Sequence, residues 1–364
     1  MERPLNRRLP IGVQTLFSDL EQRARDADFT ETFDRGGRFL KRLKQKRYYW
    51  YFQRRDGAKV VEKYVGPFTN PEITKRVAEF TALKNDFKER RSMLRALVAG
   101  GLPVSEPMSG SVIDAMCRAG FFRLRGVLVG STAFQCYSGV LGVRLADATL
   151  RTADADFAQF YAIAQQIDDK MPPMIDVLRG VDTTFREIPH LSDSRASTKF
   201  INDAAFKVEF LTPNRGSDDY QGKASPMPTL GGASADPLRY LDFLIHHPIN
   251  SLVLHEAGVP VTIPAPERFA VHKLLFSHNR ADRSKSNKDI AQVSAIIHAM
   301  ADLRSVDLSE AWQVAWQRGP AWSANLTKGL SMLDDATRDA LASAVVKGAG
   351  RRQITVKTIW PQNL

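Results

Sequence analysis

Apolar and polar positions alternate along this chain with two different periods, which predict a mixture of helices and short strands. Helical spacing covers residues 13–25 and a long segment that begins at Asn70-Pro71 and ends at Gly100-Gly101. Further helices are predicted at residues 111–119, 132–140, 158–167, 266–280, 287–300 and within 307–348, and the helix from Pro266 is expected to carry Lys273 and Arg280 on one face. Strands are predicted at residues 48–53, 60–65, 124–129, 153–157, 184–188, 198–201, 206–211, 251–255 and 259–263. Helices alternating with a small mixed sheet are typical of an α/β (α+β) fold.

The length of 364 residues exceeds what one hydrophobic core commonly organises, so two or three domains are expected. The best candidate for a linker is the stretch 102–110, which contains Pro103 and Pro107. Residues 213–235 are rich in Gly, Pro, Ser and Asp and are expected to form a surface loop. We expect a basic N-terminal helix–hairpin–helix region at 1–105, a small mixed-sheet core at 106–235 and a mainly helical C-terminal domain at 236–364.

The cysteine content and the hydropathy pattern bear on the cellular compartment. Two cysteines, Cys117 and Cys136, are too few for a disulfide framework or a zinc site, which fits a reducing cytosol. No apolar run approaches the length of a membrane span, and the N-terminal segment MERPLNRRLP lacks the apolar core of a signal peptide. The histidines form no metal-binding pattern, and His272 is expected to be an ordinary helix residue. We therefore expect a cytoplasmic protein with no membrane partner.

The net charge of +11 is concentrated in one short segment. Between Arg35 and Lys63, 11 Lys and Arg residues stand against 2 acidic residues. The two strands predicted here flank an Asp-Gly pair that favours a hairpin turn, and aromatic residues are interleaved with the basic ones. Such a ribbon suits the backbone of RNA or DNA, with phosphate contacts from Arg47, Arg54, Arg55 and Lys59. The alternative is an aromatic face that packs on the protein and leaves the charges solvated.

Candidate chemistry begins where a predicted strand meets a predicted helix. Residues 124–129 form a short apolar run, and Gly130-Ser131 follows it directly. A Gly-Ser turn at a helix N-terminus points free backbone N–H groups outward, with the helix dipole behind them. Gly130 and Ser131 are therefore candidates for binding the phosphates of a nucleoside triphosphate. The alternative is an ordinary turn between a strand and a helix.

Two carboxylates follow on the next predicted strand. Asp154 and Asp156 are two residues apart, so a strand places both side chains on one face while the residues between and after them pack inward. Two carboxylates alone would repel a phosphate, but Mg²⁺ or Mn²⁺ held between them would bridge to it. The alternative here is that both side chains lie on a solvated strand face.

The order of these motifs, GSTAFQCY followed by RTADADF, resembles the nucleotidyltransferase superfamily related to polymerase β. The stretch is similar to bacterial nucleotidyltransferase-like proteins that include abortive-infection-type toxins. The resemblance covers residues 110–300 and includes the segment PAPERFAVHKL at 264–274, then Arg280, Lys285, Lys288 and Asp289. It implies a third carboxylate on a later strand, for which Glu209 is the candidate, and phosphate neutralisation by Lys273.

The resemblance implies an enzyme that uses Mg²⁺ or Mn²⁺ to move a nucleoside monophosphate from an NTP, such as ATP, to a hydroxyl acceptor. The implied catalytic and metal-binding residues are Asp154, Asp156 and Glu209, and the implied nucleotide-binding residues are Gly130, Ser131, Lys273 and Arg280. The basic hairpin favours RNA, including a tRNA end, as the acceptor. Two alternatives stay open: a non-catalytic nucleic-acid-binding protein that keeps the scaffold, and the toxin half of a toxin–antitoxin-like module. The identity of the NTP and the oligomeric state stay open as well.

Overall fold

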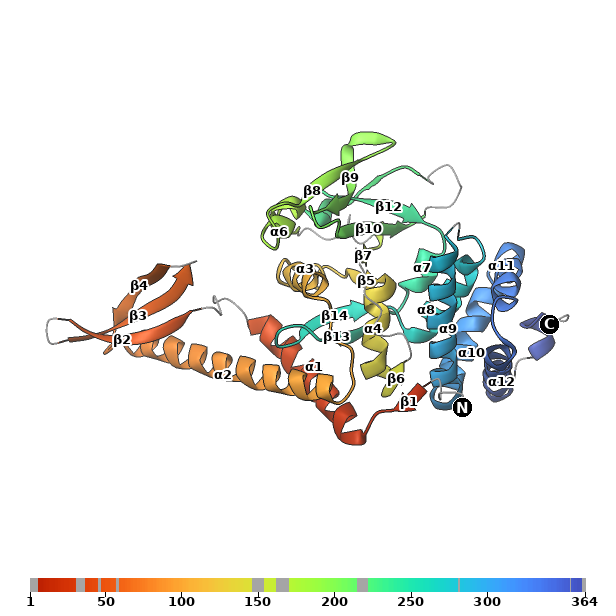
Figure 1. The fold of residues 1–364 in the computed structure, drawn as a ribbon, viewed down its shortest axis with the longest axis horizontal. Coiled ribbons are helices and arrows are strands. Elements are labelled where there is room, and N and C mark those ends of the chain that lie inside the picture. The colour runs from red at the N-terminus through yellow and green to blue at the C-terminus, as the bar shows by residue number, and fades with distance from the viewer. Residues whose placement is uncertain are drawn as a thin grey trace.

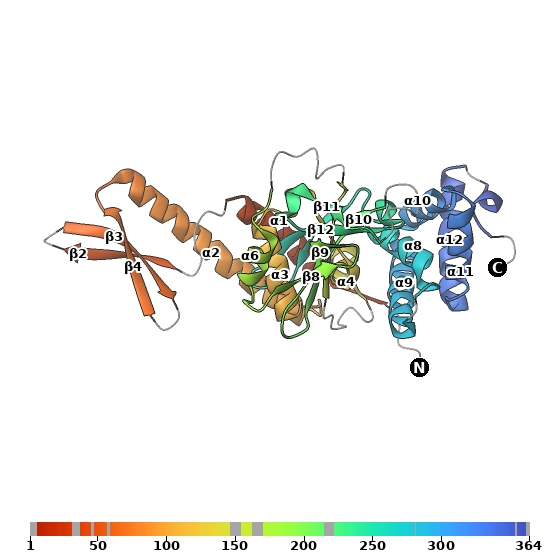
Figure 2. The same cartoon turned by 90° about the horizontal axis from the view of Figure 1, so that it is seen from above.

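The computed structural model describes residues 6–30, 37–44, 47–56, 59–145, 154–161, 170–214, 222–280, 282–353 and 355–361. These residues form three parts along the long axis of the molecule (Figures 1 and 2). A three-stranded sheet lies at one end, helices near the C-terminus lie at the other, and a mixed sheet with its helices lies between them. The fold class is α/β (α+β), as the sequence predicts.

The N-terminal part is a sheet carried by a long helix, and it has one more strand than predicted. Its elements are α1 (Ile11–Thr30), β2 (Arg38–Lys44), β3 (Arg47–Asp56), β4 (Lys59–Pro67) and α2 (Pro71–Ala99). The strands pair antiparallel in the order β2–β3–β4. The predicted two-stranded hairpin was incomplete, because Arg and Lys occupy four of the seven positions of β2 and hide its alternation. Gly57 of the predicted turn lies outside the described residues.

The central part is built on a mixed sheet of seven strands. Its path is β11 (Ser225–Pro226), β12 (Ser234–Leu238), β10 (Lys207–Pro213), β7 (Asp154–Ala158) and β5 (Val127–Val129), with β9 (Asp193–Ile201) paired to β10 and to β8 (Arg186–His190). Strand β10 runs parallel to β7 and β12, whereas β5 runs antiparallel to β7. The helices of this part include α3 (Pro107–Arg118), α4 (Gly130–Leu141) and α6 (Met174–Arg179).

The buried face of this sheet is aromatic. Phe157 of β7 and Phe210 of β10 are fully buried and stack with their ring centroids 5.8 Å apart. Phe121 contacts Phe157 at 5.1 Å, and Phe200 of β9 contacts Phe210 at 5.9 Å. Because strand side chains alternate, burying these rings turns the residues between them toward the opposite face.

The remaining elements complete the central and C-terminal parts. They are β1 (Asn6–Arg8), β6 (Val143–Leu145), η2 (Pro228–Leu230), α7 (Leu241–Leu244), β13 (Ile249–Val253), β14 (Val259–Ile263), α8 (Pro266–Ser277), α9 (Arg283–Leu303), α10 (Ser305–Trp316), α11 (Pro320–Leu330), α12 (Asp335–Arg351) and η3 (Val356–Thr358). The predicted hairpin β13–β14 and the start of a helix at Pro266 are confirmed. The helix ends at Ser277, however, so Arg280, which was predicted to lie in it, follows it in the connection to α9. Trp312 is fully buried and stacks on Trp316 with the centroids 5.7 Å apart, as expected for core residues.

Some predicted boundaries need correction. Helix α3 begins at Pro107, four residues before the predicted start, because proline is favoured in the first turn of a helix. The expected surface loop at 213–235 contains β11, η2 and the beginning of β12, and its composition hid these short elements. Residues 162–167 of a predicted helix and residues 215–221 of that loop lie outside the described part of the chain. The division into domains stays a prediction. Among the helices of the described residues, none has the length and apolarity needed to cross a bilayer.

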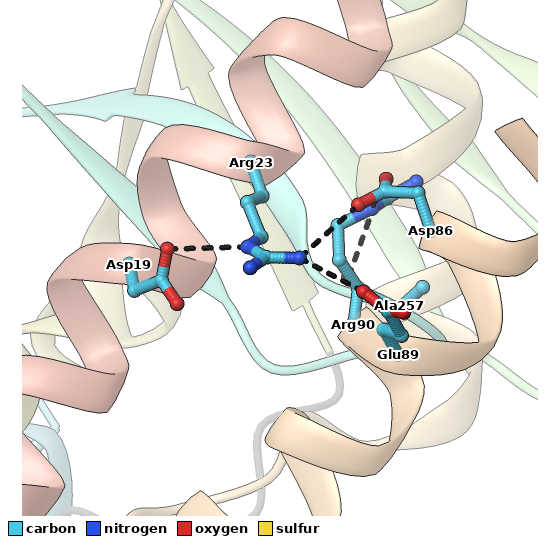
Figure 3. Close-up of polar contacts among 6 residues, drawn as sticks. All are labelled: Asp19, Arg23, Asp86, Glu89, Arg90 and Ala257. Carbon is cyan, nitrogen blue, oxygen red and sulfur yellow. Dashed lines mark hydrogen bonds and ion pairs between the residues drawn. The ribbon is translucent and has the colours of Figure 1, made fainter. Parts of the chain in front are cut away.

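A cluster of charges joins α1, α2 and the loop between β13 and β14 (Figure 3). Arg90 of α2 is 2% exposed, and it donates to Asp86 Oδ2 at 2.7 Å and to the carbonyl oxygen of Ala257 at 3.2 Å. Arg23 of α1 donates to Glu89 Oε2 at 3.0 Å. Beside these contacts, leucines of α1, α2 and β13 form a separate apolar cluster. Together they fix the C-terminal half of α2 to the central part.

Replacing Arg90 by alanine should lower the free energy of unfolding by about 2 kcal/mol. The change removes a buried donor from the Ala257 carbonyl and one cation from Asp86, although Arg23 remains 3.7 Å from Asp86. Urea unfolding followed by circular dichroism measures this loss. The matched control is Arg91→Ala, because Arg91 is 58% exposed and lies 4.0 Å from Glu256. The control should change stability by less than about 0.5 kcal/mol, and equal losses in both variants would contradict the role of the Arg90 contacts.

Candidate active site

The register of the central sheet brings the predicted carboxylates together. Strand β7 places Asp156 directly opposite Glu209 of β10 in a parallel pair, and Asp154 opposite Lys207. Asp154 and Asp156 are partly exposed, whereas Ala155 between them is buried, so both carboxylates share the face opposite the aromatic core. The three acidic residues therefore occupy neighbouring positions on one face of the sheet.

Gly130 lies against one of these carboxylates. It is the first residue of α4 and has φ of 70°, a left-handed conformation that favours glycine. A Cβ atom at this position would overlap Oδ2 of Asp156, well inside van der Waals contact. No other residue type fits here without displacing the Asp156 carboxylate. Ser131, the other residue predicted for phosphate binding, is partly exposed in the first turn of α4.

Helix α8 is held against α4 by aromatic packing. Phe269 of α8 stacks on Phe134 of α4 at 6.1 Å and meets Tyr137 edge to face at 5.2 Å. The buried hydroxyl of Tyr137 donates to the carbonyl oxygen of Pro264 at 2.9 Å, just before α8 begins. These contacts place Lys273 of α8 near Gly130, at the N-terminal end of α4.

A cavity of about 110 Å³ lies between the sheet and α8. Gly130, Asp156, Lys273 and Arg280 all line it, so the structure brings together four of the seven residues predicted for catalysis and nucleotide binding. The other three, Ser131, Asp154 and Glu209, lie outside the cavity wall. The remaining lining residues are Val129, Leu211, Leu238, Leu241, Leu244, Phe269, His272, Phe276 and Asp289.

The cationic wall of this cavity is organised by Asp289. The carboxylate of Asp289 is buried, with 6% of its side chain exposed, and it pairs with Lys273 through Oδ1 and with Arg280 at 2.8 Å through Oδ2. It pairs with both cations, and the cap of α9 is Asp282. Two cations and one carboxylate leave one net positive charge beside Asp156.

Burial affects the protonation of this wall. Burial lowers the pKa of Lys273, while the Asp289 carboxylate raises it. The pKa of His272 is lowered to about 3, first by burial and then by the charges of Lys273 and Arg280, so this imidazole is neutral. Its Nε2 atom is buried and has no hydrogen-bond partner in the described part of the chain.

His272 lies in helix α8, as expected, and also lines the cavity, a position that the sequence did not predict. A signal was present in the spacing, because Phe269, His272, Lys273 and Phe276 lie at i, i+3, i+4 and i+7 and thus on one face of α8. That face is the one that lines the cavity. A buried imidazole with a free nitrogen in such a wall is a candidate for hydrogen bonding to a ligand.

The ionisation of Asp156 is strongly perturbed by its surroundings. The pKa of Asp156 is raised from 3.8 to about 7, because burial disfavours the ionised carboxylate and because Asp154 and Glu209 repel its charge. Lys273 and Arg280 offset this rise only in part. The position opposite Glu209 on the neighbouring strand is Lys199, whose Nζ lies 3.5 Å from Glu209 Oε2 and 3.6 Å from Asp236 Oδ2.

This charge arrangement suits a divalent cation at Asp154 and Asp156. Two carboxylates on one strand face provide the hard oxygen ligands that Mg²⁺ and Mn²⁺ prefer. The raised pKa of Asp156 means that negative charge here lacks compensation, which a cation would supply. Among the described residues no group of three or more acidic, histidine or cysteine side chains is already arranged around one metal position. The Asp154–Asp156 pair is therefore the donor set that fits, and Glu209 is engaged with Lys199.

The residues predicted to bind nucleic acid lie far from this site, in the sheet at the other end of α2 (Figure 1). Arg47 and Arg55 are exposed on β3. By their backbones Arg54 lies opposite Val61, and Lys59 begins β4. The side chains of Arg54 and Lys59 lie outside what the structure describes.

Comparisons with known proteins bear on this arrangement. A family model described as a nucleotidyltransferase matches residues 107–317, more than half of the chain. The crystal structure of an antigenic nucleotidyltransferase-like protein from Paracoccidioides brasiliensis is similar over 62% of this chain and 95% of that chain, with 14% sequence identity and a TM-score of 0.31. No curated protein matches the chain. The residues matched by the family model include every residue that lines the cavity.

Replacing Gly130 by alanine should displace the Asp156 carboxylate and weaken binding of an NTP by at least about tenfold. The matched control is Gly232→Ala, because Gly232 also has positive φ, of 89°, but an added Cβ there meets no atom within 4 Å. Both variants should lose about 1 kcal/mol of stability from backbone strain. Isothermal titration calorimetry with each NTP and thermal unfolding measure the two effects. Equal NTP affinities for the two variants would contradict a ligand site beside Gly130.

The raised pKa of Asp156 predicts a pH-dependent stability. The folded state retains the Asp156 proton up to about pH 7, whereas the unfolded chain releases it near pH 4, so stability should fall as pH rises from about 4 to 7. At about 1.4 kcal/mol per unit of pKa, the loss is on the order of 4 kcal/mol. Asp156→Asn should remove this decline and unfold at a higher temperature than wild type at pH 8.

Circular dichroism melts at pH 4 to 8 measure this effect. The control is Asp203→Asn, since Asp203 is 71% exposed and pairs with Arg186 at the surface. That variant should keep the wild-type slope. Adding Mg²⁺ at pH 8 should stabilise wild type but not Asp156→Asn, because only wild type retains the pair of carboxylates. An unchanged slope in Asp156→Asn would mean that the proton is held elsewhere.

Proposed function

This chain belongs to the nucleotidyltransferase family, and on that premise we propose that it transfers a nucleoside monophosphate from an NTP to a hydroxyl acceptor with Mg²⁺ or Mn²⁺. The observation that carries the proposal is the composition of one cavity wall. Gly130 at the N-terminal end of α4, the Asp156 carboxylate and the cations Lys273 and Arg280 meet there. An anion-binding helix end, a metal-binding carboxylate and cations are the groups that phosphoryl chemistry needs.

The triphosphate would lie between α4 and α8. The lack of a side chain at Gly130 lets the Asp156 carboxylate, and a metal held by it, lie against the first turn of α4, whose backbone N–H groups would bind phosphate oxygens. Lys273 would neutralise a phosphate oxygen from the opposite wall, because Asp289 uses only part of the charge of Lys273 and Arg280. Ser131, next to Gly130, would donate its hydroxyl to the same phosphates.

The carboxylates would hold the metal and accept the proton. Asp154 and Asp156 would bind Mg²⁺ or Mn²⁺, which when bound neutralises phosphate oxygens and lowers the barrier to attack on phosphorus. The acceptor oxygen would form a bond to the α-phosphorus, and the bond from that phosphorus to the bridging oxygen would break to release pyrophosphate. Glu209, beside Asp156, would take the proton of the acceptor hydroxyl, with Lys199 holding its carboxylate in place.

The rest of the cavity would receive the nucleoside. Its wall combines leucines and phenylalanines with the neutral imidazole of His272. Apolar side chains suit the flat face of a base, and the unpartnered Nε2 of His272 would bond to a polar group of the base or the ribose. This hydrogen bond does not require a charged imidazole, because His272 stays neutral.

We infer that the acceptor is an RNA hydroxyl. The support for this is the concentration of positive charge between Arg35 and Lys63 in a chain of the nucleotidyltransferase family. The relation to abortive-infection-type toxins, the bacterial origin and the identity of the NTP stay predictions.

Label transfer from NTPs tests the proposed reaction. The protein is incubated with each α-³²P-labelled NTP, total RNA and Mg²⁺, and incorporation is measured on a denaturing gel. Asp154→Asn and Asp156→Asn should each lower incorporation by at least about a hundredfold, since each removes a metal ligand. Asp203→Asn, exposed and outside the site, should react as wild type does. Incorporation that survives in both site variants, or that persists in EDTA, would reject the proposed metal site.

A further inference from the structure

The two faces of the β2–β3–β4 sheet differ in what covers them. On one face Phe39 and Phe52 lie 5.1 Å apart, and both contact Phe80 of α2, at 4.8 and 6.0 Å. On the same face Trp50 donates from Nε1 to Oγ1 of Thr74 of α2 at 3.1 Å. This inner face packs on α2, so the expectation that some of the aromatic residues serve only for packing holds for these three.

The opposite face combines tyrosines with arginines. On β2 and β3 this outer face carries Arg38, Leu40, Arg42, Arg47, Tyr49, Tyr51, Gln53 and Arg55, the positions that alternate with the inner ones. The register places Val60, Glu62 and Tyr64 of β4 opposite Arg55, Gln53 and Tyr51. Its four arginines are exposed, and both tyrosines are half-buried. Tyr49 lies opposite Arg42 in the strand register, and Arg38 donates twice to Gln53 Oε1, at 2.9 and 2.7 Å.

We propose that this outer face binds single-stranded RNA. Half-exposed rings two residues apart on one strand lie about 7 Å from each other, so that successive bases of an extended strand can stack on them. Exposed guanidinium groups on the same face bind phosphates in pairs of hydrogen bonds. The segment that carries the sheet has 11 basic residues against 2 acidic ones, which attracts a polyanion.

Single-stranded RNA fits this face better than a duplex or a membrane. A duplex keeps its base faces stacked inside, where Tyr49 and Tyr51 cannot reach them. A membrane surface would require apolar side chains that insert between lipids, and the centre of the outer face carries tyrosines and arginines instead. The proposed reaction would use such an RNA as its acceptor, and only this connection depends on that reaction.

The helix α2 sets the distance between this face and the central part. From Pro71 to Asp86 the helix spans roughly 22 Å at about 1.5 Å per residue. Beyond Asp86 it is fixed by Arg90 and Arg23, as Figure 3 shows. The sheet is therefore carried away from the cavity (Figures 1 and 2), and an RNA bound to it would need length to reach the cavity. Longer single strands should be better acceptors than short ones.

Fluorescence anisotropy with the full-length protein and a labelled 30-nucleotide single-stranded RNA tests the proposal. The double substitution Tyr49→Thr and Tyr51→Thr removes both rings and introduces β-branched residues, which favour a strand. It should weaken binding by about tenfold for each ring. Arg42→Gln with Arg55→Gln should weaken binding and lower the slope of log affinity against log salt by about 1 to 2. The control is Arg91→Gln with Arg95→Gln, which removes two exposed charges from α2 and should bind as wild type.

The outcomes separate this proposal from its rivals. Equal affinity of wild type and both outer-face variants would overturn it, as would stronger binding to a duplex of the same sequence. Co-sedimentation with phosphatidylserine vesicles in the absence of RNA binding would instead identify a membrane surface. RNA binding without any label transfer would reject the proposed reaction and leave this inference standing. Label transfer together with an RNA affinity that the outer-face variants leave unchanged would reject this inference and leave the proposed reaction standing.

Discussion

The close approach of the Asp156 carboxylate to Gly130 is the constraint on which the central part depends. A carboxylate oxygen occupies the space of a Cβ, so only glycine allows the Asp156 carboxylate to lie this near to the first turn of α4. The left-handed φ of Gly130 turns the chain from β5 into α4 at the same point. The helix end and the Asp156 carboxylate thus meet because one side chain is missing. Buried rings on the other side of the sheet hold the strands in this register.

Charge balance explains the groups around this contact. Burial and the two neighbouring carboxylates, Asp154 and Glu209, raise the pKa of Asp156, and cations from β9, from α8 and from the turn after α8 surround these carboxylates. Lys199 of β9 pairs with Glu209, while Lys273 and Arg280 face Asp156 across the cavity. Asp289 pairs with both Lys273 and Arg280, but its single negative charge does not neutralise both cations. The site therefore keeps both uncompensated negative charge for a cation and positive charge for a phosphate.

Local patterns in the sequence were enough to predict many of the elements. The apolar run before Gly130, the alternation around Asp156 and the start of α8 at Pro266 each depend on neighbours in the chain, and all three are confirmed. Local patterns failed where composition masked periodicity. Strand β2 was missed because basic residues occur on both of its faces. Strand β12 was missed because its short run closely follows Gly231 and Gly232. In both cases pairing with a neighbouring strand stabilises a segment of weak local preference.

By itself the sequence determined the fold class and the residue types of the candidate site. Period and turn chemistry are local, and motif spacing specifies which residues share a strand or helix face. Only the tertiary structure decided which of these faces meet. It paired Asp289 with both Lys273 and Arg280, placed the neutral His272 in the cavity wall, and separated the inner from the outer face of the N-terminal sheet. These outcomes depend on contacts between segments far apart in the chain, whose packing and charge no local pattern records.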